Sequence, residues 1–155
     1  MKLFSKRKAK QLLEQAMDLH KKGDLRAAEY LYTQSLSYDP NSATAHLNYG
    51  DLLRKTNRPK AAETEYRKAM IMEPEIADPH ASLGALYHSQ NRYEEAEAAY
   101  QKALSYNPGN INTQMNLAQL YMDTARYTEM KKIYTYLLNK VTDPRLKNKI
   151  EERLK

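Results

Sequence analysis

The chain has no cysteine, no tryptophan and a single phenylalanine, Phe4, among its 155 residues. Without cysteine it can form no disulfide framework, no thiolate zinc site and no thiol nucleophile. The four glycines all lie at expected turns or helix-packing positions, so no phosphate-binding glycine-rich loop is expected. No run of ~18 apolar residues is present, so no membrane-spanning helix is expected. The basic start lacks the apolar stretch of a secretory signal, and the cytoplasm is the expected location.

Positive charge is concentrated at the two ends of the chain. The first ten residues carry five positive charges and residues 139–155 a net +3, which leaves residues 11–138 at −2 within a total of +6. A nucleic-acid-binding protein is expected to place its cations along the folded surface. We therefore expect no nucleic-acid partner.

Three residue types recur along the chain at one constant interval, and such a period indicates a repeat architecture. The prolines of this series are Pro40, Pro74 and Pro108. The tyrosines are Tyr32, Tyr66, Tyr100 and Tyr134, and the alanines are Ala28, Ala62 and Ala96. The period divides the chain into a basic extension, four units and a tail, with the boundaries 1–8, 9–42, 43–76, 77–110, 111–144 and 145–155.

Each unit has the pattern of two helices joined by a short turn. In the first helix of the third unit, Leu83, Gly84 and Tyr87 follow the i, i+1, i+4 spacing of one helical stripe. Glycine inside a helix costs about 1 kcal/mol relative to alanine, so Gly50 and Gly84 indicate a place where two helices approach closely. No segment shows the alternation of a strand, and the predicted fold is all-α.

The third unit closely resembles a tetratricopeptide repeat (TPR). The resemblance rests on Leu83-Gly84 and Tyr87 in its first helix, followed by Ala96, Tyr100 and Pro108. It implies a right-handed α-solenoid of four helix-turn-helix units with a C-terminal capping helix. The end units depart from the pattern, as terminal repeats do. These departures are Gln15 in the first unit and Met130, Leu137 and Thr142 in the fourth.

The resemblance implies a concave groove lined by the first helices, in which a peptide of a partner protein would bind. Asn48 and Asn116 occupy equivalent positions, with Ser82 between them, and an amide can both donate to and accept from a peptide backbone. Other TPR arrays clamp a terminal carboxylate with Lys, Asn and Arg, but only Asn48 matches that set here. The implied groove residues are Leu13, Met17, Leu47, Asn48, Asp51, Arg54, Ser82, Ala85, His88, Met115, Asn116, Gln119 and Met122.

Catalytic and metal-binding patterns are not found in the sequence. His20 and His88 lie two units apart, too far to share a metal ion, and His46 and His80 are expected to cover the core between helices. Glu94, Glu95 and Glu97 are expected on a solvated helix face. We therefore expect no enzyme activity, no metal and no cofactor.

The sequence predicts a non-catalytic adaptor, and two alternatives stay open. Exposed apolar residues at the end of the array, namely Met130, Ile133 and Leu137, could stack on a second copy to form a homo-oligomer. Alternatively, the cations of residues 1–10, with Leu3 and Phe4 as an apolar anchor, could tether the chain to an anionic surface.

Overall fold

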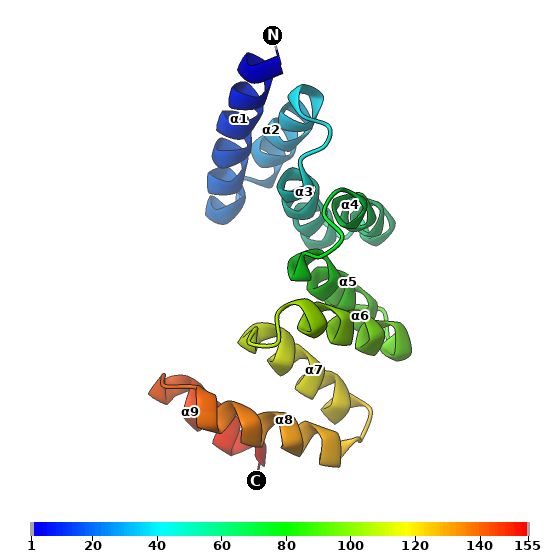
Figure 1. Ribbon diagram of the computed structural model, residues 1–155, viewed down its shortest axis with the longest axis vertical. Coiled ribbons are helices and arrows are strands. Elements are labelled where there is room, and N and C mark those ends of the chain that lie inside the picture. Colours follow the sequence, from blue (N-terminus) through cyan, green and yellow to red (C-terminus); the bar gives the residue numbers. More distant parts are fainter. Residues whose placement is uncertain (1, 155) are drawn as a thin grey trace. The chain divides into compact units, whose positions relative to one another are not determined.

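The structure is a computed structural model that describes residues 2–154, with side chains from residue 4 onward. Within this range the chain forms nine helices and no strand, which confirms the predicted all-α fold (Figure 1). The ends of the extension and of the tail, at Met1 and Lys155, lie outside the described residues. The helices are α1 (Lys2–Lys22), α2 (Leu25–Tyr38), α3 (Ala43–Lys55), α4 (Pro59–Met72), α5 (Ala77–Ser89), α6 (Tyr93–Tyr106), α7 (Ile111–Asp123), α8 (Tyr127–Lys140) and α9 (Pro144–Leu154).

Contacts divide the chain into two compact units, residues 1–82 and 83–155. In the first unit, α1 pairs with α2 and α3 pairs with α4. In the second unit, α7 packs between α6 and α8, and α9 packs on α8. The predicted segments 43–76, 77–110 and 111–144 each contain two helices, whereas α1 begins before the predicted start of the first unit at residue 9.

The turns inside the four hairpins share one backbone conformation. Gly23, Asn57, Asn91 and Ala125 follow the period of the repeat, and all have a positive φ, between 57° and 87°. This left-handed residue ends each first helix, and in the first hairpin the next amide, that of Asp24, donates to the Leu19 carbonyl at 3.0 Å. Glycine and asparagine tolerate this conformation best, which explains their recurrence at the turn.

The periodic tyrosines form the core of the hairpins. Tyr32, Tyr66, Tyr100 and Tyr134 are all at most 1% exposed. A Cβ atom added to Gly50 would lie 2.6 Å from the Tyr66 ring, and one added to Gly84 would lie 2.6 Å from the Tyr100 ring. The small residue therefore makes room for the tyrosine ring of the second helix, rather than simply letting two helix backbones approach.

The end of the fourth hairpin corrects one prediction. Met130 is 3% exposed and Leu137 is fully buried, whereas Ile133 is half-buried. The physical reason is that α7 and α9 both pack on α8, and α9 contributes the buried Ile150. The expectation that Met130 and Leu137 offer an exposed apolar stacking surface was wrong.

No helix within residues 2–154 combines the length and the apolar character needed to cross a membrane.

Candidate functional site

The predicted groove residues of the first unit lie on α1 and α3, with Ser82 on α5. Leu13 is buried at 9% exposure, whereas Met17 is 41% exposed. Leu47, Asn48 and Asp51 are half-buried and Arg54 is exposed. Leucine and methionine side chains are thus presented beside polar groups along the same helices.

Leu13 and Met17 line a pocket of about 460 Å³ in the first unit. Its other walls include Lys6, Lys10 and Glu14 of α1 and residues from α2 to the start of α3. Sequence reasoning placed Lys6 in the basic extension and Lys10 in the first repeat, and it assigned neither to this pocket. The available signal was that Lys6, Lys10, Leu13 and Met17 follow one another at steps of three or four positions, because residues so spaced share a helix face.

Two polar groups of α3 already have partners. The Asn48 side chain donates from Nδ2 to the Thr44 carbonyl at 2.8 Å, one helical turn away. The Tyr66 hydroxyl donates to Oδ1 of Asp51 at 2.7 Å. One N–H of Asn48 is therefore used within its own helix, so Asn48 and Asn116 are not equivalent as hydrogen-bond donors.

The second unit has a more polar pocket of about 370 Å³ that brings together three predicted residues, Ala85, His88 and Asn116. His88 contributes Nε2, which lies 2.9 Å from Oδ2 of Asp123. Gln119 donates from Nε2 to the other oxygen of Asp123 at 2.7 Å. The remaining lining residues are Ser89, Asn91, Tyr93 and Tyr100.

The C-terminal helix reaches two of the predicted groove residues. Arg153 of α9 donates from Nη1 to Oε1 of Gln119 at 3.0 Å and approaches the Met122 sulfur at 3.5 Å. Met115, the remaining predicted residue of α7, is half-buried. Sequence reasoning treated α9 only as a solvating cap, because the repeat pattern carries no information on a helix beyond the last repeat.

His20 of the first unit lies near the charges of Lys55 and Arg54. Its Nδ1 atom lies 3.3 Å from the Tyr32 hydroxyl. Burial lowers the pKa of His20, and the nearby charge of Lys55 lowers it further.

Among the described residues, no group of three or more His, Cys, Asp or Glu side chains is placed to hold a metal ion.

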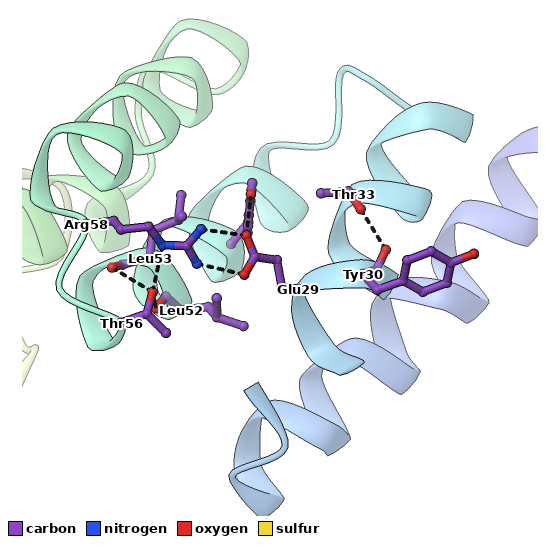
Figure 2. A network of polar contacts seen from close by, with 8 residues as sticks. Glu29, Tyr30, Thr33, Leu52, Leu53, Thr56 and Arg58 are labelled. Carbon is purple, nitrogen blue, oxygen red and sulfur yellow. Dashed lines mark hydrogen bonds and ion pairs between the residues drawn. The ribbon is translucent and has the colours of Figure 1, made fainter. Parts of the chain in front are cut away.

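A bidentate ion pair joins neighbouring hairpins in the first unit (Figure 2). Arg58 donates from Nη1 and Nη2 to the two carboxylate oxygens of Glu29, each at 2.7 Å. The hydroxyl of Tyr49 donates to the same carboxylate at 3.2 Å. The hydrogen bonds from Arg58 hold the pKa of Glu29 below its ordinary value.

The second unit contains a similar Glu–Arg pair two repeats further along the chain, here joined by a single hydrogen bond. Arg126 donates from Nη1 to Oε2 of Glu97 at 2.5 Å, and the Tyr121 hydroxyl donates to Oε1 at 2.8 Å. Glu97 is therefore a partner of Arg126 rather than a freely solvated side chain, which corrects that expectation. The separation of Glu from Arg along the chain is the same in both pairs, and this was the signal in the sequence.

His46 is buried, as expected, but it carries an ion pair that sequence reasoning missed. Its Nδ1 atom lies 2.5 Å from Oε2 of Glu65, and its Nε2 atom lies 2.9 Å from the Pro40 carbonyl oxygen. Both ring nitrogens therefore have a hydrogen-bonding partner. The other oxygen of Glu65 accepts from Lys68 at 2.8 Å. Burial opposes ionisation of Glu65, but the hydrogen bonds from His46 and Lys68 prevail and lower its pKa.

These lowered carboxyl pKa values predict how stability depends on pH. A carboxyl whose pKa is lower in the folded state stabilises the fold at pH values above its unfolded-state pKa, which is about 4.5 for Glu29 and Glu65. This stabilisation is lost as the pH falls through the folded-state pKa. We expect the free energy of unfolding, measured with urea, to fall as the pH is lowered from 5 to 3. The decrease should be smaller in Glu65→Gln; an equal decrease would contradict a role for Glu65.

Comparisons with known proteins agree with this fold. The family model for the Cilia and flagella-associated protein 70 middle TPR-like domain matches residues 12–138. PilF of Pseudomonas aeruginosa is similar, with a TM-score of 0.80 and 23% identity over 87% of this chain, which spans 62% of the PilF chain. The first TPR of Spaghetti (RPAP3), solved with the HSP90 peptide SRMEEVD, has a TM-score of 0.72 and 22% identity. That match covers 77% of this chain and 94% of the other. No curated protein sequence matches significantly.

Proposed function

Because the chain belongs to the TPR-like family represented by the middle domain of cilia and flagella-associated protein 70, we propose that it is a non-catalytic adaptor that binds a peptide segment of a partner protein. The observation that supports this most is the pocket of about 370 Å³ in the second unit, where Asn116 and His88 meet. The cytoplasm is the proposed location. A solved relative holds a peptide, which makes peptide binding a reasonable function for this fold.

The two pockets support different parts of this proposal. In the first unit, Leu13 and Met17 offer an apolar site, and methionine adapts to irregular partner surfaces. In the second unit, the exposed amide of Asn116 can donate to and accept from a peptide backbone. We propose that an apolar side chain of the partner enters the first pocket and that Asn116 holds peptide backbone in the second.

A binding experiment on the full chain tests the proposal. Partners recovered by pull-down from the cells of origin are identified, and their binding is compared among variants. We expect Asn48→Ala/Asn116→Ala to weaken binding by about fivefold to thirtyfold, since one or two hydrogen bonds of roughly 1 kcal/mol each are lost. Most of the loss should come from Asn116→Ala, because Asn48 already donates to Thr44.

Asn139→Ala is the matched control for this experiment. Asn139 lies on α8, a second helix, and donates to the Thr135 carbonyl one turn earlier, as Asn48 does to Thr44. We expect Asn139→Ala to bind like the wild type. Equal recovery of every partner by the double variant and the wild type would remove the asparagine positions from the proposal.

The alternative of self-assembly has lost its original basis, because Met130 and Leu137 are buried. We therefore do not propose stacking of a second copy through these side chains.

A further inference from the structure

The first helix extends beyond the repeat pattern. α1 has 21 residues, whereas α3 and α7 have 13 each. Two serine hydroxyls join the start of α1 to α2. Ser5 donates to the Tyr38 carbonyl at 2.7 Å, and Ser35 donates to the Ala9 carbonyl at 2.8 Å. The extension is thus held against the hairpin as a part of its surface.

The outer face of this extension combines aromatic and basic side chains. Phe4 is 76% exposed, and Arg7 and Lys8 follow it at the i+3 and i+4 positions, on the same side of the helix. Tyr38, whose carbonyl Ser5 contacts, is 42% exposed. We call Phe4, Arg7, Lys8 and Tyr38 the N-terminal patch. An exposed phenylalanine beside two cations is well suited to an interface between water and lipid, where the ring leaves water and the cations stay hydrated.

Among the side chains that the structure describes, the cations of this region form no ion pair. From residue 2 to residue 13 the sequence has five basic residues and no acidic one. Among the described residues, Arg58, Lys68 and Arg126 form ion pairs, whereas Lys6, Arg7, Lys8 and Lys10 form none. The patch is therefore free to pair with an external anion.

We propose that the N-terminal patch docks the protein on an anionic lipid surface, with Phe4 inserted among the headgroups and Arg7 and Lys8 beside the lipid phosphates or carboxylates. The combination of charge and an exposed aromatic side chain favours a membrane surface over nucleic acid. A nucleic-acid site would be expected to continue its cations along the body of the fold, but residues 11–138 have a net charge of −2. Lys6 and Lys10 line the pocket of the first unit, where Glu14 and Asp39 balance their charge, so the proposal rests on Arg7 and Lys8.

Vesicle flotation with the full chain tests this proposal, using phosphatidylcholine vesicles with and without phosphatidylserine. We expect binding only to the vesicles with phosphatidylserine.

Each cation near an anionic surface strengthens binding about fivefold, so Arg7→Gln/Lys8→Gln should weaken it about 25-fold. Phe4→Ser should weaken binding about tenfold by removing the inserted ring. Raising the salt from ~0.1 M to ~1 M shortens the Debye length from about 10 Å to about 3 Å and should release most of the protein.

Two control variants separate the patch from general charge and hydrophobicity. Lys131→Gln/Lys132→Gln removes two neighbouring exposed cations from α8, and Ile71→Ser removes an apolar side chain that is 78% exposed on α4. We expect both controls to bind vesicles like the wild type. Equal binding to vesicles without phosphatidylserine, unchanged binding of the patch variants, or binding to single-stranded RNA without binding to vesicles would each overturn the proposal.

Discussion

Replacing Gly50 with valine is expected to lower the free energy of unfolding by about 3 kcal/mol, measured by urea denaturation. A Cβ at this position would lie 2.6 Å from Cε1 of Tyr66, closer than any van der Waals contact. The ring cannot easily move away, because Tyr66 is fully buried and its hydroxyl donates to Asp51. The better helix propensity of valine offsets only a few tenths of a kcal/mol.

Two further variants make this expectation specific. Gly109→Val is the matched control, since a Cβ there would meet no atom nearer than 3.8 Å, and we expect a change within about 0.5 kcal/mol. The double variant Gly50→Val/Tyr66→Ala should lose less free energy of unfolding than the two single variants lose together, because removing the Tyr66 ring also removes the clash. Full additivity would show that Tyr66 is not what restricts residue 50.

Breaking the buried ion pair of the first unit is the second large effect. We expect Glu65→Leu to lower the free energy of unfolding by about 3 kcal/mol, because it leaves the His46 ring without its charged partner. The His46 side chain is 7% exposed and that of Glu65 11%, so water cannot replace the lost contact. The measurement is urea denaturation at neutral pH.

Replacing both partners should reverse this loss. The equivalent positions of the first repeat hold Leu12 and Leu31. A buried ion pair replaced by well-packed apolar residues is often neutral for stability, so His46→Leu/Glu65→Leu is expected within about 1 kcal/mol of the wild type. Lys68 needs no buried partner, because its side chain is 47% exposed. A double variant as unstable as Glu65→Leu would contradict this account of the pair.

The regular part of the fold could be predicted because every hairpin obeys the same constraint. Tyr66 and Tyr100 each fill a space beside a small residue of the preceding helix, and this contact recurs with the period of the repeat. The turn glycine and asparagines follow the same period, because each turn needs a positive φ. The residues that recur with the period of the repeat are therefore those that make the recurring packing and turn contacts.

Apart from the recurring Glu–Arg pair, the contacts that were missed occur once. Glu65 occupies a position that is apolar in the other units, as Leu31, Ala99 and Ile133, and its partner His46 lies on the preceding helix. The contact of Arg153 with Gln119 joins a repeat to a helix outside the pattern. Such contacts depend on where two particular helices meet, which the repeat period does not specify.

Side-chain orientation within the candidate site was also beyond prediction. Asn48 and Asn116 have the same position in the repeat, but Asn48 bonds to its own helix at the Thr44 carbonyl. An asparagine amide at this position can bond either to a backbone carbonyl of its own helix or to a bound partner, and local geometry decides between the two. Composition and period do not decide it.

The most direct test of the proposed peptide-binding surface is site-specific photo-crosslinking in the cells of origin. A photoreactive residue is placed at Ser89, which lines the pocket of the second unit, or at Ser105, an exposed residue of α6. The two serines are matched, since each donates to the carbonyl at its i−3 position. We predict a covalent partner at position 89 and none at position 105. Adducts at position 105 alone, or equally at both positions, would contradict binding along the first helices.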